Sequence, residues 1–447
     1  MFVTLLVVTL STGPSHGPVR AGAFGIVPTM TAASDSGNIG GGFVGFSPVQ
    51  EAQGTTYYVS FCTTANVTAS CEDPIGLTYV AAANIVVLTE GNGSNPTLPP
   101  LEPPAIIEFD PASFHIVGRT NLNCTPGMPL YPGSGFDVYV PCAGPGLLVF
   151  NYSSERVVGT ISTPFFVVSL AFDSGSGKIY AAGWDENGTD LVGEIDPATN
   201  ALVQLFSPPN IGLAGFYGAG AYLLAYDPAT DRLLMPNSSG PYEEAGTSVL
   251  SVNPESGQVT STFSTGASIL SLSVAPRSNQ ILVTTTSPNE TEVFDAASYS
   301  EEAQVSLPSC LPGVCAGGEA LAVAVDPSHG DAYILTSLAL DVLNLTTFSL
   351  VATIYDYGAG WTGSGVYVPG VDRVFGAYQY FYQPYWGFMI QLTHSSHEAL
   401  TSLLWLPTGL GIFVSAAIAG IVCAFIRFRS PRYYGGPPGW ESFSRRP

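Results

Sequence analysis

Short apolar runs separated by turn residues make up most of this 447-residue chain. Runs such as TTYYVSF (55–61) and DVYV (137–140) are rich in β-branched and aromatic residues, and Gly, Pro, Asn or Asp lie at their ends. Helical spacing of apolar positions, at i, i+3, i+4 and i+7, is hard to find before residue 400. Such a pattern is typical of strands joined by tight turns. The sequence therefore predicts an all-β fold.

One turn pattern recurs along the chain: an apolar residue, then Asp or Asn, then Ser or Thr three positions later. The copies lie at Asp110, Asn151, Asp196, Asn253, Asp295 and Asn344, with a degenerate seventh at Thr393, so successive copies are 41, 45, 57, 42, 49 and 49 residues apart. An Asp or Asn at this place can accept a hydrogen bond from the backbone two residues on. A unit of this length holds two hairpins, and seven units predict a seven-bladed β-propeller with four-stranded blades. The ring would run from about residue 30 to 400, with the early strands around TTYYVSF (55–61) helping to close it, and the spacing also permits six or eight blades.

A second hairpin type lies between these copies, and AVDPSHGDAYIL (324–335) is the copy with the most suggestive chemistry. Asp326, His329 and Asp331 there resemble a metal or acid–base group. In the other copies the place of Gly330 is held by Gly135, Gly177, Asp231, Asn279 and Asp372, all residue types that accept a left-handed backbone. The place of His329 is held by Ser134, Ser176, Thr230, Ser278 and Val371, which share no site chemistry. We therefore interpret the stretch as a hairpin tip whose side chains are exposed and bind no metal.

EIDPATNALV (194–203) together with AVDPSHGDAYIL resembles the repeat of the YVTN/YncE-like β-propeller family. The resemblance covers about residues 105–400, although AYIL and IYAA stand where the family has its YVTN tetrapeptide. It implies a propeller in an exported, surface-layer-like protein. It implies little about activity, because propellers serve both as binding modules and as enzymes.

The two ends of the chain predict export and anchoring. Residues 402–426 form an uncharged segment that is long enough for a transmembrane helix. Arg427, Arg429 and Arg432 follow it directly, as expected at the cytoplasmic end of a span. Residues 427–447 would then be a short basic cytoplasmic tail, and 24–400 the extracytoplasmic propeller. Residues 1–23 resemble a signal peptide with cleavage near Ala23, but the basic flank usual for such a peptide is missing. We therefore expect a single-pass protein of the cell membrane, with the propeller facing the exterior.

Charge is scarce and strongly one-sided. The part before residue 427 has 7 basic and 33 acidic residues, a net of −26, whereas the tail has five Arg and one Glu, a net of +4, and the sum is −22. Phosphates would be repelled, so nucleic acid is excluded as a partner. Only 10% of the residues are charged, and such a low charge would suit an acidic exterior.

Cysteines and glycosylation motifs agree with export. Three local pairs predict disulfides: Cys62–Cys71, Cys124–Cys142 and Cys310–Cys315, although six cysteines permit other pairings. Eight N-x-S/T motifs precede the predicted span, at Asn66, Asn92, Asn123, Asn151, Asn187, Asn237, Asn289 and Asn344. We expect these to lie on a secreted surface that could carry glycans.

No familiar catalytic motif occurs in the sequence, and the five histidines are scattered. The most distinctive local feature is YQYFYQPYWGF (378–388), in which Tyr380, Tyr382, Tyr385 and Trp386 could contact a sugar or a protein. A buried strand face is the alternative for this segment, and proximity to the bilayer is another. We expect no cofactor, no metal and no catalytic residue. The predicted function is a binding, adhesion or scaffold module for an extracellular protein or glycan; the alternative is a lactonase-like propeller enzyme with a cation in its central channel.

Overall fold

The computed structural model describes residues 74–91, 103–113, 115–144, 146–213, 223–238, 245–286, 288–307, 320–336, 339–355 and 359–380, together with strand segments 29–32, 43–47, 57–60 and 387–393. These residues form strands β1 to β29 and no helix. All of them belong to the compact unit Met1–His394. The all-β prediction is confirmed for this part of the chain.

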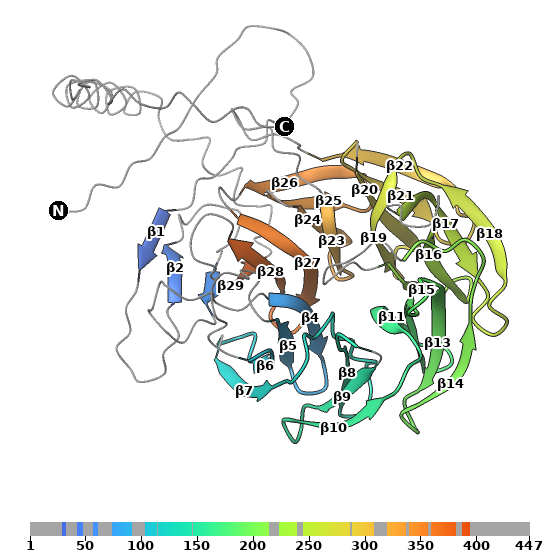
Figure 1. Ribbon diagram of the computed structural model, residues 1–447. Coiled ribbons are helices and arrows are strands. Elements are labelled where there is room, and N and C mark those ends of the chain that lie inside the picture. Colours follow the sequence, from blue (N-terminus) through green and yellow to red (C-terminus); the bar gives the residue numbers. More distant parts are fainter. Residues whose placement is uncertain are drawn as a thin grey trace, which may run out of the picture. The chain divides into compact units, whose positions relative to one another are not determined.

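Six sheets are built from strands that are consecutive in sequence, and Figure 1 shows them following one another around a ring. Five of these blades have four antiparallel strands. Their strands are β4 (Pro74–Val80), β5 (Ile85–Glu90), β6 (Ala105–Phe109) and β7 (Ile116–Asn121); β11 (Phe166–Asp173), β12 (Lys178–Trp184), β13 (Asp190–Asp196) and β14 (Ala201–Phe206); β15 (Ala225–Asp227), β16 (Arg232–Ser238), β17 (Ala245–Val252) and β18 (Val259–Ser264); β19 (Ser268–Ala275), β20 (Gln280–Thr286), β21 (Glu290–Asp295) and β22 (Glu301–Ser306); and β23 (Ala320–Asp326), β24 (Asp331–Thr336), β25 (Ala339–Asn344) and β26 (Ser349–Tyr355).

The remaining blade has three strands, β8 (Asp137–Pro141), β9 (Leu147–Asn151) and β10 (Arg156–Ile161). Isolated bridges from Pro126 to Cys142 and from Leu130 to Tyr139 run along β8, in the place of an innermost strand. Cys124 and Cys142 are joined by a disulfide with their Cα atoms 5.8 Å apart. The disulfide thus ties this irregular inner segment to the blade.

A seventh sheet differs from these six, and it closes the ring. It has six strands in the order β1 (Thr29–Ala32), β2 (Phe43–Ser47), β3 (Tyr57–Ser60), β29 (Gly387–Thr393), β28 (Arg373–Tyr380) and β27 (Ala359–Val368), so it combines both ends of the described chain. The prediction of a seven-bladed propeller is therefore wrong: the structure shows six blades of consecutive strands, not seven, and a six-stranded closing sheet. Six is one of the blade numbers that the spacing of the repeats permits. Early strands join β29 because the last repeat has too few strands of its own to finish a blade.

The closing sheet packs against a blade on each side. Val368, Phe375 and Ala377 are buried in one hydrophobic cluster with Leu77, Phe109 and other residues of the β4–β7 blade. On the other side, a Cβ atom added at Gly365 would meet Leu335 Cδ1 of the β23–β26 blade at 2.7 Å. The absence of a side chain at Gly365 therefore lets β27 approach that blade closely.

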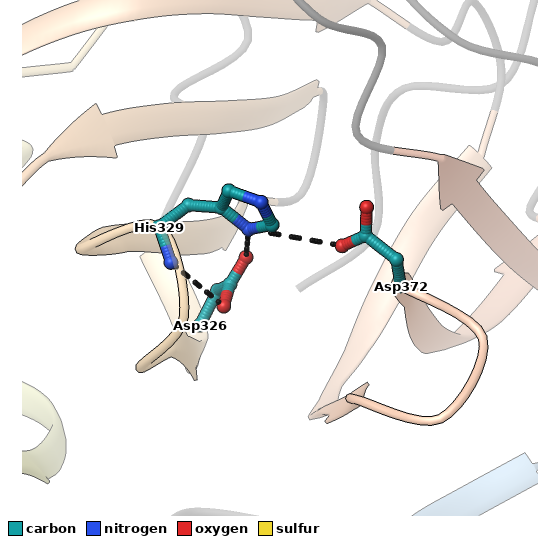
Figure 2. Close-up of side chains that lie close together, drawn as sticks. All are labelled: Asp326, His329 and Asp372. Carbon is teal, nitrogen blue, oxygen red and sulfur yellow. Dashed lines mark hydrogen bonds and ion pairs between the residues drawn. The ribbon is translucent and has the colours of Figure 1, made fainter.

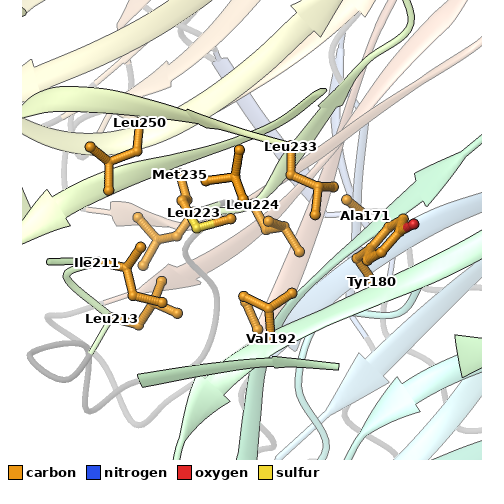
Figure 3. Packing of buried hydrophobic residues seen from close by; sticks show 12 residues of the cluster. Ala171, Tyr180, Val192, Ile211, Leu213, Leu223, Leu224, Leu233, Met235 and Leu250 are labelled. Atoms are coloured by element: carbon orange, nitrogen blue, oxygen red, sulfur yellow. The ribbon is translucent and has the colours of Figure 1, made fainter. Parts of the chain in front are cut away.

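Apolar clusters between neighbouring blades supply the core. Between the β11–β14 and β15–β18 blades, Figure 3 shows Ala171, Tyr180 and Val192 facing Leu233, Met235 and Leu250, with Leu223 and Leu224 between them. Each blade buries its faces only against its neighbours, so the stability of the ring depends on every interface being closed.

The turn chemistry expected from the sequence is present at the hairpin tips. Positive φ angles occur at all six positions predicted to need them: Gly135, Gly177, Asp231, Asn279, Gly330 and Asp372. In the other turn type the Asx side chain accepts a backbone N–H two residues on, as in the bond from Ala198 N to Asp196 Oδ1 at 3.0 Å. These local predictions are confirmed.

Within the described residues, no helix is long and apolar enough to cross a membrane. The predicted span 402–426, the tail 427–447 and the segment 1–23 lie outside those residues.

Candidate functional site

Only one group within the described part of the chain brings three potential metal-ligating side chains together: Asp326, His329 and Asp372, whose ligand atoms lie within 4.8 Å of one another. Asp326 ends β23, His329 lies in the turn before β24, and Asp372 lies in the turn between β27 and β28 (Figure 2). The group therefore connects the last regular blade to the closing sheet. We call this contact between the two turns the joint. The sequence pattern indicated the first two residues but not Asp372 as their partner.

Asp326 organises its own turn. Its Oδ1 accepts hydrogen bonds from the backbone N–H groups of Ser328 at 2.7 Å and His329 at 3.3 Å, while Oδ2 lies 2.6 Å from Nδ1 of His329. The residue is fully buried. Every oxygen of this carboxylate thus has a donor within the turn, and those donors satisfy it inside the protein.

His329 reaches from this turn toward the closing sheet. Its Nδ1 lies 3.8 Å from Asp372 Oδ1, and its side chain is 37% exposed. The hydrogen bond to Asp326 raises the pKa of His329, and the nearby charges of Asp326, Asp372 and Asp331 raise it further against the opposing effect of burial. The imidazolium form is therefore favoured by carboxylates on both sides of the joint.

Tyr367 of β27 completes the group. Its hydroxyl donates to Asp372 Oδ1 at 2.8 Å, and it also interacts with Ser328 of the neighbouring turn. Burial raises the pKa of Tyr367 above its usual value, with the bond to Asp372 as a further cause. The tyrosine remains a neutral donor that links the two turns.

An equivalent joint lies elsewhere in the ring, and it has no histidine. Asp173 accepts the backbone N–H groups of Gly175 and Ser176 at 2.7 and 3.0 Å, and its Oδ2 accepts the Ser176 hydroxyl at 2.5 Å. The hydroxyl of Tyr226, in the next blade, donates to Asp231 Oδ1 at 3.0 Å, and the Tyr226 side chain also hydrogen-bonds Asp173. Asp173, Ser176, Tyr226 and Asp231 thus take the places of Asp326, His329, Tyr367 and Asp372. Because the same joint forms without a histidine, packing between the two sheets is sufficient to explain its arrangement.

The prediction of exposed side chains at this hairpin tip is wrong for two of the three residues. Asp326 is fully buried and Asp331 is 2% exposed, whereas His329 is exposed. Asp331 Oδ1 accepts the side-chain amide of Asn344 at 3.0 Å, which places it under the other turn of the same blade. Neighbouring turns and blades bury these carboxylates, and a single hairpin could not.

A sequence signal for the joint does exist. Tyrosine is followed five residues later by a left-handed Asx in Tyr79/Asn84, Tyr226/Asp231 and Tyr367/Asp372, and the tyrosine hydroxyl bonds the Asx oxygen in all three pairs. The spacing spans one tight hairpin. It could have identified Tyr367 and Asp372 before the structure, but not their contact with the neighbouring blade.

Several other carboxyl groups are buried away from this joint. Burial raises the pKa of Glu108 to about 7, with Glu155 adding to the effect, and burial raises the pKa of Asp341 to about 7. One carboxyl oxygen of each, Glu108 Oε1 and Asp341 Oδ2, has no hydrogen-bond partner among the described residues. Since a buried, unpaired carboxylate is costly, these groups favour the protonated form.

The predicted aromatic contacts stay predictions, because Tyr382, Tyr385 and Trp386 lie outside the described residues and Tyr380 is described only as the end of β28. Cys62, Cys71, Cys310 and Cys315 also lie outside them, as do Asn66 and Asn92. Of the remaining glycosylation motifs, Asn123 and Asn187 are exposed. Asn151 and Asn344 serve as turn residues whose side-chain amides donate to Asp137 and Asp331.

Substitutions in the tip of the β23–β24 hairpin should have unequal effects on the free energy of unfolding at pH 8. Asp326→Ala should cost about 1–3 kcal/mol, because buried donors lose their acceptor. Gly330→Val should cost about 1–3 kcal/mol, since φ is +71° there. His329→Ser should change stability by no more than about 0.5 kcal/mol, because a hydroxyl fills this role at Ser176. Chemical denaturation of the full-length chain measures all three, and a larger effect for His329→Ser than for Asp326→Ala would contradict the structural role.

Exposed apolar side chains gather on the outermost strands of three consecutive blades. Ile116 and Val117 of β7, Val158 of β10, and Val203 and Leu205 of β14 are 43–51% exposed. The corresponding strands further round the ring expose polar residues instead: Thr260, Thr262 and Ser264 on β18, and Glu301, Glu302 and Gln304 on β22. We call the first set the apolar rim. It distinguishes one arc of the ring from the other.

Comparison with known proteins supports the fold alone. No family model and no curated protein matches the chain. Among solved structures, the chain is similar to the Cps50 (Swd1) β-propeller domain of Myceliophteria thermophila, with a TM-score of 0.54 and 10% identity over 73% of this chain and 99% of that one. The described part of this chain is thus a β-propeller, and the resemblance to YVTN/YncE-like repeats stays a prediction.

Proposed function

We propose that this protein is a binding module whose propeller is displayed on the cell exterior by the predicted span 402–426, and that it holds a protein partner against the apolar rim. The observation that carries the proposal is the contrast between the exposed Val, Ile and Leu of β7, β10 and β14 and the hydroxyl and acidic residues at the corresponding places on β18 and β22. A β-propeller commonly serves as a scaffold for interactions, which agrees with this use.

A protein partner suits this surface better than a glycan. Strands β7, β10 and β14 are the last strands of their sheets, so no further strand pairs with their outer edges within the described structure. Such edges, with apolar side chains at alternate positions such as Val203 and Leu205, can add an extended peptide or pack an apolar surface. Sugars would instead favour flat aromatic groups, which the rim residues lack.

A photo-crosslinking amino acid in place of Val203 tests the proposal in intact cells that carry the full-length chain. We expect a discrete adduct containing a peptide partner from position 203 and none from Thr260, the matched position on the polar arc. With the partner identified and purified, Val203→Thr combined with Leu205→Thr should weaken binding about tenfold, the effect of losing about 1.4 kcal/mol. Thr260→Ser combined with Thr262→Ser is the control and should leave affinity unchanged.

Three outcomes would contradict the proposal: equal adducts from both positions, an adduct containing only carbohydrate, or an affinity that the substitutions on β14 leave unchanged. Display on the exterior is tested separately. Protease added to intact cells should remove the propeller and leave a short tail fragment, and full protection of the propeller would contradict that part.

The enzymatic alternative would need ligands that converge on the central axis. Among the described residues, the group of Asp326, His329 and Asp372 is already engaged in a joint between sheets. No observation on the described residues favours that alternative over binding.

A further inference from the structure

Two joints in the ring are similar, but His329 in one takes the place of Ser176 in the other. A histidine can be protonated and a serine cannot, so the two joints should respond differently to pH. We propose that protonation of His329 locks the closing sheet to the β23–β26 blade, so that the ring closes more tightly in acid than at neutral or alkaline pH. The proposal is independent of the partner proposed above. It concerns the interface at which the irregular closing sheet meets the last regular blade.

The geometry supplies a charge-dependent contact between the two sides. With a neutral imidazole, Nδ1–H donates to Asp326 Oδ2 at 2.6 Å, and Asp372 Oδ1 lies 3.8 Å from the same nitrogen. With an imidazolium, a positive charge lies between a carboxylate of the blade and a carboxylate of the closing sheet. The attraction across the joint then adds to the uncharged bond from Tyr367 to Asp372.

The carboxylates around His329 favour the imidazolium. Asp326 lies in its own turn, Asp331 and Tyr333 come from β24, and Tyr367 and Asp372 come from the closing sheet. From the blade on the other side, Arg277 in the turn between β19 and β20 donates to the Pro327 carbonyl at 3.2 Å. Arg373, next to Asp372, donates to the carbonyls of Pro111 and Ala112.

The direction in which the stability of the joint changes with pH follows from linkage between protonation and closure. The pKa of His329 is raised in the closed joint, and part of the cause is the charge of Asp372 on the other side. Separating the two turns would remove that part, so the proton binds more tightly when the joint is closed. The added stability is therefore complete below the pKa of a free histidine, about 6.5, and is lost as the pH rises through the raised value.

The test compares two joints within the same molecule. In the full-length chain, backbone hydrogen exchange is measured at pH 5 and pH 8 for peptides covering 366–373 and 225–232, with correction for intrinsic exchange rates. We expect the protection of 366–373 relative to 225–232 to fall about fivefold from pH 5 to pH 8, the size of a partly exposed ion pair of about 1 kcal/mol. The equivalent joint at Asp173 serves as the internal reference, because Ser176 does not titrate.

Two reciprocal variants make the test specific. His329→Ser should make the protection ratio independent of pH, since it recreates the serine joint. Ser176→His should give the 225–232 peptide the pH dependence, because Asp173 and Asp231 flank that position in the same way. Asp372→Asn should reduce the dependence of 366–373 while leaving the hydrogen bond from Tyr367 in place.

Direct titration of His329 by ring resonances should give a pKa above that of a free histidine, and Asp372→Asn should lower it. A wild-type ratio that does not change with pH, a change that persists in His329→Ser, or a His329 pKa unaffected by Asp372→Asn would each overturn the proposal.

Discussion

Unfolding of the full-length chain by denaturant is expected to become easier as the pH rises from about 4 to about 8, in contrast to the usual behaviour of paired carboxylates. Glu108 and Asp341 carry this expectation, because burial raises the pKa of each to about 7. Their folded-state pKa lies above the unfolded value, so the folded state binds more protons within that window and stability falls as they ionise. Each group should contribute on the order of 3 kcal/mol, from roughly 1.4 kcal/mol per pKa unit.

Neutral isosteres test this expectation group by group. Asp341→Asn and Glu108→Gln should each flatten the dependence of unfolding free energy on pH, because an amide cannot ionise. Asp295→Asn is the matched control: hydrogen bonds from the Ser298 side chain and backbone hold the pKa of this turn carboxylate below its usual range. It should not remove the loss of stability at high pH. Stability that is constant or rising between pH 5 and pH 8 would contradict the argument.

Phe375→Ala is expected to lower the free energy of unfolding by about 3–5 kcal/mol, the cost of a large core cavity. Phe375 of β28 is fully buried, and its ring centroid lies 5.6 Å from that of Phe109 in the β4–β7 blade. The cavity would open where the closing sheet meets the first regular blade. Because each blade is stabilised by its neighbours, loss at this interface weakens the whole ring.

Phe136→Ala provides the control for that measurement. Phe136 lies at a hairpin tip and is 59% exposed, so its truncation should change stability by no more than about 0.5 kcal/mol. Denaturant titration of both full-length variants at one pH compares them directly. Similar losses for the two would show that ring closure does not depend on the Phe109–Phe375 contact.

Local chemistry explains why the repeats could be recognised from the sequence. A left-handed backbone at Gly330, Asn279 or Asp372 favours Gly, Asn or Asp at that same position, so the sequence shows the constraint directly. The same holds for the Asx turns at Asp196 and its equivalents. Hairpin positions, strand order within a blade and the propeller class follow from such signals. The Cys124–Cys142 pair was also predictable, since it brackets a short segment.

Contacts between blades could not be predicted in this way. Asp326 was expected to be exposed because its own hairpin is a surface turn. It is buried where the neighbouring sheet packs on that turn, and Tyr367 and Asp372 of that sheet come more than 40 positions later in the chain. The six-stranded closing sheet likewise depends on pairing between β3 and β29, more than 320 residues apart. The run TTYYVSF (55–61) could be predicted as a strand that helps to close the ring, but its pairing partner and the other two early strands could not.

The sequence by itself thus determined the turn conformations, the four-strand repeat and the all-β class, and on it alone rest the predicted span and signal segment. The tertiary structure decided the number of regular blades, the joint of Asp326, His329 and Asp372, and the burial of Glu108 and Asp341. The physical reason is the distance along the chain between the residues that interact. Backbone conformation is set by each residue and its neighbours in sequence, whereas burial and ion pairing are set by whichever side chains ring closure brings from distant parts of the chain.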